Sequence, residues 1–327
     1  MILGIESTAH TFGIGIVHKG KVLANVKDSY TTEKGGIIPL DAAKHHERVS
    51  EEVYKKALDA AKIKEENIEA LAFSQGPGLS PCLLAGIKFT KKLAEKLGKP
   101  VVPVNHCVAH LEIGRITGAS DPVLLYASGA NTQIIAYASG KYRIFGETLD
   151  IGVGNFIDTF ARHAGIGFPG GPKIAELASK SQNYIELPYS IKGMDVAFSG
   201  TLTKLKQMLD TGKFKLEDLC FSLQETAFPM LIEAAERALA HTGKSELLLG
   251  GGVGCNKRLQ EMCKIMCEER GAKFFVPENP LLVDNAAMIA FLGEMMYKKG
   301  IKIENEDLKK LDIMPKQRTD EVDVKWK

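Results

Sequence analysis

The two halves of this 327-residue chain open with the same succession of hydrophobic runs and turns. Apolar runs lie at 2–6, 12–17 and from 22 in the first half, and at 123–127, 133–137 and from 142 in the second. Short apolar runs bounded by turn residues are typical of β-strands. Each half is therefore predicted to begin with three antiparallel strands. A chance similarity is the alternative, because ββ units are common.

After each set of strands the hydrophobic period becomes helical. Helices are expected at 45–61, 82–97, 154–164, 172–179, 221–241, 256–270 and 284–299, with further strands at 71–75 and 247–249. This order predicts an α/β protein made of two related domains. We place the N-terminal domain at 1–120 and the C-terminal domain at 121–327, with a helical insertion at about 150–245.

Three turns of small residues are candidates for ligand contact: residues 7–10, 128–132 and 250–254. Exposed backbone N–H groups in such turns can meet an anion. The glycine-rich turn follows a buried strand and opens a helix at Asn256, so a nucleotide can approach both backbone and helix N-terminus. It is not the Rossmann fingerprint, which needs an early βαβ unit. Because duplicated domains normally bind ligands between them, we expect an actin-like, sugar-kinase-like nucleotide cleft.

Composition limits the class of protein but not its partners. A chain with 45% hydrophobic and 25% charged residues is globular, and a net charge of +2 neither favours nor excludes nucleic acid. Lysines at 88, 91, 92, 96 and 99 could contact a nucleic acid, although such a run is more typical of a solvated helix face. No apolar stretch of spanning length and no basic leader is present, so we expect no membrane contact and a cytoplasmic location.

His106 and His110 have the i, i+4 spacing that puts two imidazoles on one face of a helix, within reach of one metal ion. Asp284 is the candidate oxygen ligand. Two alternatives stay open: the histidines bind backbone or water, and Asp284 caps the last long helix. A zinc peptidase is disfavoured, because its motif needs Glu directly after the first His and Cys107 stands there. Tyr126 is otherwise a core aromatic residue.

Several segments together resemble the universal tRNA threonylcarbamoyltransferase family, formerly described as O-sialoglycoprotein endopeptidases. They are GIEST at 4–8, QGPGL at 75–79, NHCVAH at 105–110, SGANT at 128–132, FPGGP at 168–172, FSG at 198–200 and GGGVGCN at 250–256. They follow family order up to Asp284, so the resemblance covers nearly the whole chain. Segments 198–200 and 318–320 resemble the archaeal and eukaryotic branch, the catalytic subunit of the KEOPS complex.

The resemblance implies a duplicated actin-like ATPase (ribonuclease H-like) fold with the ligand in the interdomain cleft. It implies transfer of a threonylcarbamoyl group from threonylcarbamoyl-AMP to the adenosine just 3′ of the tRNA anticodon. The positions that match the family's ligands to one divalent metal, iron or zinc, are His106, His110, Tyr126 and Asp284. The positions that match its adenylate contacts are Tyr126, Ala127, Ser128, Gly129, Ala130, Asp158, Gly171 and Asn256. ATP or an analogue is expected to bind in the same cleft.

One position departs from the family pattern. Members often carry an acidic residue four places after the glycine that matches Gly171, whereas this chain has Ala175 there and Glu176 next. The contact is therefore not transferred to either residue. The resemblance also implies tRNA, a separate small protein kinase and other KEOPS subunits as partners, because no kinase domain follows in this sequence.

The general base is not identified by the sequence. His10, His45 and His46 are candidates because we expect them near the cleft. Two other functions remain as alternatives: a small-molecule kinase with Glu6 as its acidic residue, and a non-enzymatic scaffold that binds nucleotide and regulates a partner kinase. The kinase alternative does not explain a two-histidine metal site. The scaffold alternative predicts that nucleotide binding survives the loss of His106, His110 and Asp284.

Overall fold

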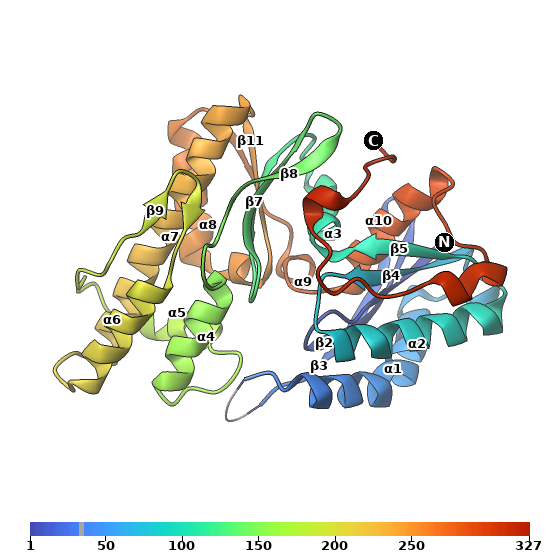
Figure 1. Ribbon diagram of the computed structural model, residues 1–327, viewed down its shortest axis with the longest axis horizontal. Helices are drawn as coiled ribbons and strands as arrows, with labels where there is room; N and C mark the ends of the chain where they lie inside the picture. The colour runs from blue at the N-terminus through green and yellow to red at the C-terminus, as the bar shows by residue number, and fades with distance from the viewer. Residues whose placement is uncertain (33–35) are drawn as a thin grey trace.

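The computed structural model describes residues 1–32 and 36–327, which form two five-stranded sheets of the same topology (Figure 1). The first has the order β3-β2-β1-β4-β5 and the second β8-β7-β6-β11-β12. The strands of the first are β1 (Ile2–Glu6), β2 (Thr11–His18), β3 (Lys21–Ser29), β4 (Ala70–Gly76) and β5 (Val101–Asn105). Those of the second are β6 (Val123–Ala127), β7 (Thr132–Ala138), β8 (Lys141–Glu147), β11 (Glu246–Gly250) and β12 (Lys273–Phe275).

The strand pairing confirms that the halves are duplicates. In the first sheet β1–β2 and β2–β3 are antiparallel, and β1–β4 and β4–β5 are parallel. In the second sheet β6–β7 and β7–β8 are antiparallel, and β6–β11 and β11–β12 are parallel. A chance similarity between two hairpins would not extend to the parallel strands that follow. The duplicated α/β prediction is therefore correct.

Helices cover the faces of both sheets (Figure 1). They are α1 (Pro39–Ala61), α2 (Ser80–Leu97), α3 (His106–Glu112), α4 (Val153–His163), α5 (Gly171–Ala178), α6 (Ser199–Asp210), α7 (Leu216–Thr242), α8 (Lys257–Glu269), α9 (Asn279–Leu282) and α10 (Ala286–Lys298). A small hairpin of β9 (Ile191–Lys192) and β10 (Asp195–Val196) precedes α6. Among the residues described, no helix has the length and apolarity needed to cross a bilayer.

Two local differences from the predicted elements have clear causes. Helix α1 begins at Pro39 rather than at residue 45, because proline suits the first helical position, where its missing N–H has no partner to lose. Strand β5 was not predicted, since Pro103 interrupts its hydrophobic run. This strand pairs with β4 at one edge of its sheet, where a proline is tolerated.

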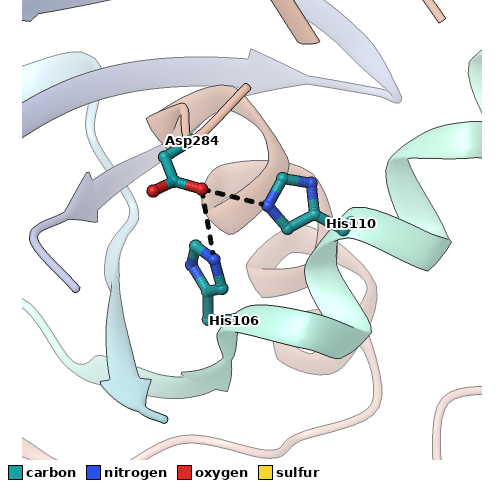
Figure 2. A group of neighbouring side chains, drawn as sticks. All are labelled: His106, His110 and Asp284. Atoms are coloured by element: carbon teal, nitrogen blue, oxygen red, sulfur yellow. Dashed lines mark hydrogen bonds and ion pairs between the residues drawn. The ribbon is translucent and has the colours of Figure 1, made fainter. Parts of the chain in front are cut away.

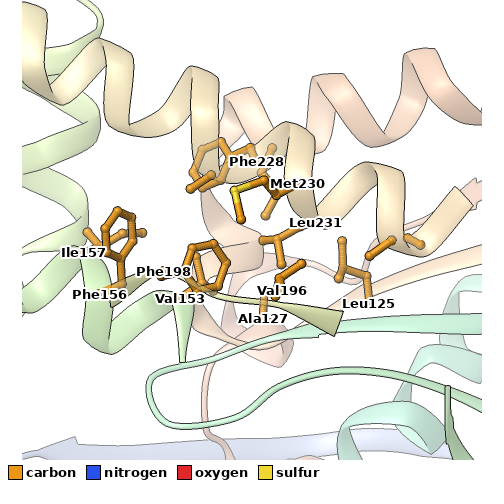
Figure 3. Close-up of a cluster of buried hydrophobic side chains, with 14 of the residues drawn as sticks. Leu125, Ala127, Val153, Phe156, Ile157, Val196, Phe198, Phe228, Met230 and Leu231 are labelled. Carbon is orange, nitrogen blue, oxygen red and sulfur yellow. The ribbon is translucent and has the colours of Figure 1, made fainter. Parts of the chain in front are cut away.

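The cores of the two halves meet around α3 and α10. Helices α1 and α2 pack on one face of the first sheet, and α10 packs on the other. In the second half, α4 and α7 pack against β6 in the cluster of buried side chains drawn in Figure 3. Residues of both sheets, α3 and α10 share one further buried cluster. Helix α3 therefore lies where the halves meet, although the exact domain boundaries remain predictions.

Candidate functional site

A cavity of about 1740 Å³ lies between the halves and is lined by residues of both. All three predicted turns reach it, through Thr8 to His10 from the first half, Ser128 to Asn131 from the second, and Gly252 and Val253 from the glycine-rich turn. This volume is well above the roughly 300–1,000 Å³ of ordinary small-molecule sites. The cleft can therefore hold a ligand larger than an ordinary small molecule.

The glycine-rich turn needs glycine for steric reasons. Gly251 has φ +87°, in the left-handed region, and a side chain there would overlap the backbone of Ala127 and Ser128. After a short 3₁₀ helix, Asn256 caps α8 by accepting hydrogen bonds from the N–H groups of Arg258 (2.9 Å) and Leu259 (3.3 Å). The turns at residues 128–132 and 250–254 are therefore in close contact at the same end of the second sheet.

Helix α3 presents His106 and His110 side by side, as the spacing predicted (Figure 2). Asn105 caps this helix by accepting from the N–H of Val108 at 3.0 Å. Cys107 is not among the three residues whose possible ligand atoms gather there, and its Sγ lies 3.8 Å from Asn131 Nδ2. The alternative role for Asp284 is wrong, because Asn285 is the cap of α10 and accepts from the N–H of Met288 at 3.0 Å. The carboxylate of Asp284 faces the two histidines instead.

The separations within this cluster fit a bound metal ion. Asp284 Oδ1 lies 3.4 Å from His106 Nε2 and 3.4 Å from His110 Nε2. The ligand atoms of the three residues all lie within 4.8 Å of one another. Tetrahedral bonds of about 2.0–2.2 Å place neighbouring ligand atoms about 3.3–3.6 Å apart. Two imidazole nitrogens and one carboxylate oxygen are also a donor set that zinc and iron accept.

The electrostatics of the cluster favour a cation. Burial by itself would lower the pKa of His106, but the carboxylates of Glu6 and Asp284 raise it well above its usual value. Burial lowers the pKa of His110, and the bond to Asp284 opposes this only in part. The pKa of Asp284 is held well below its usual range, since the two histidines outweigh the opposing effect of burial. The cluster thus stabilises positive charge next to the Asp284 carboxylate.

Tyr126 completes the wall of this cluster. Its ring centroid lies 4.9 Å from that of His110, and its side chain is 1% exposed. It also lines the cavity. Burial raises the pKa of the hydroxyl well above its usual value, so the group is protonated in the protein without a ligand.

The predicted adenylate-binding residues lie around the same cavity. The lining includes Tyr126, Ser128, Gly129, Ala130, Asp158, Gly171 and Asn256. The side chain of Ala127 packs into the core of the second half, which leaves its backbone as the part able to reach a ligand. Asp158 Oδ1 accepts from the N–H of Gly170 at 2.8 Å and fixes the turn before α5. Burial raises the pKa of this carboxyl despite the backbone hydrogen bonds.

The departure on α5 has a structural counterpart. Ala175 lines the cavity, whereas Glu176 forms ion pairs with Lys173 and Lys180, each at 2.7 Å. Those lysines lower the pKa of the Glu176 carboxyl to about 2. Glu176 is therefore part of a charged helix surface.

Several cavity residues were missed from the sequence. Gln224, Glu225, Arg258 and Glu261 line one end of the cavity, and Pro315 reaches it from the C-terminal segment. Arg258 pairs with both acids at 2.7 Å. Helix periodicity does not identify such residues, because it assigns polar side chains on α7 and α8 to the solvent-exposed face of each helix.

The three candidate bases occupy different places. His10 lines the cavity. His46 is fully buried, its Nε2 donates to the carbonyl of Ala9 at 3.0 Å, and its Nδ1 faces that of His45 at 3.4 Å. His45 Nε2 lies 2.7 Å from Asp28 Oδ1. Because His45 and His46 are held within the first half, His10 is the better candidate for contact with a substrate.

His46 predicts how stability depends on pH. Burial and the neighbouring His45 lower its pKa from 6.5 to about 4. Between these values the unfolded chain binds a proton that the folded protein does not, so stability falls as pH decreases from 6.5 towards 4. The loss attributable to this residue is about 3 kcal/mol. Chemical denaturation of the metal-free protein across this range should give a flatter pH profile for His46→Gln than for wild type.

The control for this measurement is His163→Gln, which removes a partly exposed histidine paired with Asp210. Its profile should follow wild type. Parallel profiles for wild type and His46→Gln would contradict the assignment to His46.

Comparison with known proteins agrees with this arrangement. The family profile described as "TsaD: tRNA N6-adenosine threonylcarbamoyltransferase" matches residues 21–291. A Thermococcus kodakarensis protein named tRNA N6-adenosine threonylcarbamoyltransferase is 57% identical over 324 residues, which cover 99% of each chain. A Methanosarcina mazei protein named probable bifunctional tRNA threonylcarbamoyladenosine biosynthesis protein is 53% identical over 329 residues, covering 99% of this chain and 59% of its own.

Among solved structures, T. kodakarensis HypF matches 94% of this chain and 48% of its own, with a TM-score of 0.63 at 13% identity. Such low identity bears on the fold alone. Together with the repeated sheets, it confirms the duplicated actin-like fold with its cavity between the halves.

Proposed function

The chain belongs to the tRNA N6-adenosine threonylcarbamoyltransferase family, and from this premise we propose how its cleft performs that transfer. The threonylcarbamoyl group moves from threonylcarbamoyl-AMP to the N6 amine of the adenosine just 3′ of the tRNA anticodon. The observation that carries the proposal is the cluster of His106, His110 and Asp284 at the wall of a cavity that both halves line.

His106, His110 and Asp284, with Tyr126 beside them, would hold one divalent metal ion, iron or zinc. The 3.4 Å separations and the carboxylate of Asp284, whose side chain is only 18% exposed, support this ligand set. A bound ion would orient the donor and polarise its oxygens.

The donor fits the turn of residues 128–130 and the opposite wall of the cavity. The backbone N–H groups of Gly129 and Ala130 would stabilise negative charge on the leaving phosphate. Asp158, Gly171 and Asn256 would contact the adenylate, and ATP or an analogue would occupy the same space. The N6 nitrogen bonds to the carbamoyl carbon, the bond from that carbon to the phosphate oxygen breaks, AMP leaves and N6 releases a proton.

Positioning supplies much of the rate, because an exocyclic adenine amine is a poor nucleophile. His10 is our candidate acceptor for the released proton, since its ring lines the cavity. Glu6 does not fit the kinase alternative: it is fully buried against His106 at 3.0 Å rather than facing the cavity.

We propose that partner chains supply much of the tRNA contact. Three lysines of the α2 run, Lys88, Lys92 and Lys96, form ion pairs with Glu47, Glu51 and Glu65, as expected for a solvated helix face. A net charge of +2 also gives little general attraction for phosphate. The partners would be a separate small kinase and other subunits of a KEOPS-like complex in the cytoplasm. The bifunctional name of the longer M. mazei relative supports a link between this chain and a second activity.

A transfer assay tests the proposal. The purified chain, with and without its candidate partners, is incubated with threonylcarbamoyl-AMP and unmodified tRNA, and the modified nucleoside is measured by mass spectrometry. We expect modification of wild-type tRNA and none of a matched tRNA carrying guanosine at that position. If no combination yields the nucleoside, and His106→Ala behaves as wild type in every assay, the proposal is wrong.

A further inference from the structure

Glu6 is a fully buried carboxylate behind one of the two cluster histidines. It ends β1, and its side chain has no solvent exposure. Its Oε2 lies 3.0 Å from His106 Nδ1, on the side of the ring away from Asp284. Its Oε1 accepts from the N–H (2.7 Å) and hydroxyl (2.6 Å) of Thr8. Burying a carboxylate is costly unless hydrogen bonds or opposite charge compensate.

The compensation of this charge comes from the metal cluster. Within residues 1–32 and 36–327, no lysine or arginine forms an ion pair with Glu6, and His106 is its one basic partner. Glu6 and Asp284 together carry two negative charges beside two histidines. These two carboxylates with two neutral imidazoles would balance a divalent cation. A divalent cation bound by the cluster would therefore compensate the buried negative charge of Glu6.

We propose that Glu6 is a positioning residue for the metal: it holds the proton of His106 on Nδ1 and so leaves the Nε2 lone pair directed at the ion. An ionised carboxylate can only accept a hydrogen bond, so His106 Nδ1 must be the donor. Imidazole carries a lone pair on the other nitrogen when neutral, and Nε2 is the atom that faces Asp284. Such a carboxylate also fixes the ring and makes it a stronger ligand.

His110 lacks this support. Its Nδ1 is buried and has no hydrogen-bond partner among the described residues. Apart from the contact of its Nε2 with Asp284 at 3.4 Å, the orientation of His110 depends on packing against His106 and Tyr126, whose ring centroids lie 4.8 Å and 4.9 Å away. The two ligands are not equivalent, and the electrostatic control of the cluster lies on the His106 side.

Glu6→Gln is the sharpest test, because it keeps shape and reverses the hydrogen bond. The amide oxygen can still accept from Thr8, while the amide nitrogen donates to His106 Nδ1 and drives the proton to Nε2. We expect the Kd for Zn²⁺, measured by competition with a chelator, to rise about 10–100-fold. The inference builds on the metal site of the proposed function, but Zn²⁺ binding is measured without tRNA or donor and is independent of transfer.

A second readout separates this role from a purely structural one. The readout is the Nδ1 resonance of His106 in protein labelled with ¹⁵N-histidine, assigned by its loss in His106→Asn. In wild type we expect the chemical shift of a protonated nitrogen. In Glu6→Gln we expect the shift of an unprotonated nitrogen. This measurement uses the metal-free protein, so it does not depend on how much ion is bound.

A matched control identifies general effects of the substitution. Glu294→Gln changes another buried glutamate, which accepts from the N–H groups of Lys19 and Gly20, and should leave the Zn²⁺ Kd within about threefold of wild type. If Glu6→Gln does not fold, the same measurements can be made on Glu6→Asp. This variant keeps the carboxylate but moves it away from His106 Nδ1, so it should weaken Zn²⁺ binding. An unchanged Zn²⁺ Kd in a folded Glu6 variant, or an unchanged Nδ1 resonance in Glu6→Gln, would overturn the proposal.

Discussion

Replacing Asp284 by Asn is expected to reduce threonylcarbamoyl transfer by roughly 100-fold or more. The substitution keeps the size of the side chain but removes the negative charge that faces both histidines at 3.4 Å. Losing about 3 kcal/mol of transition-state stabilisation through a weakened metal site corresponds to that factor. The measurement is the rate of modified nucleoside formation with saturating donor, together with metal content by mass spectrometry of the purified protein.

Asp210→Asn is the matched control, because this exposed carboxylate pairs with His163 on the surface of the helical region. It should transfer at the wild-type rate and keep its metal. If an Asp284 variant loses its metal but transfers at the normal rate, the metal cluster is not needed for the reaction. One that retains metal and activity would show that this carboxylate is not a ligand.

The second large effect concerns stability rather than chemistry. Replacing Gly15 by Ala should destabilise the fold by about 3 kcal/mol or more. Gly15 lies on β2 directly beneath the start of α10, where a methyl group would overlap the backbone of Ala286 and Ala287. Backbone atoms of a packed helix cannot move aside as a flexible side chain can. The free energy of unfolding, from urea titration monitored by circular dichroism, gives the size of the effect.

Gly200→Ala provides the comparison. Gly200 lies in the first turn of α6, and a methyl group there meets no atom within 4 Å. Because alanine favours helix over glycine, this variant should be as stable as wild type or slightly more so. Equal stability of the two alanine variants would mean that α10 does not pack on β2 as closely as described.

Local patterns predicted the repeated parts of the fold well. The runs at 2–6 and 123–127 became β1 and β6, and the small residues after each became cavity-lining turns. These features depend on period and turn chemistry, which are properties of neighbouring residues. The i, i+4 spacing of His106 and His110 likewise needs one helix and nothing else.

The parts that were missed depend on contacts between distant segments. Asn285 rather than Asp284 caps α10, a choice between adjacent residues that the sequence leaves equal. Glu6 reads as the polar end of a strand, and its partner lies 100 residues away. A buried acid at the end of an apolar run was the available signal, since such groups are seldom buried without a partner.

The packing of α10 on the first sheet also determines when that sheet can be completed during synthesis. The strands β1 and β2 leave the ribosome well before the helix that covers one of their faces, because that helix begins at residue 286. Domains generally fold as they emerge, starting from the N-terminus. Here one apolar face of the first sheet stays uncovered until almost all of the second half has been synthesised. Asp284 arrives in the same stretch of chain, so the metal cluster and the first sheet are completed together.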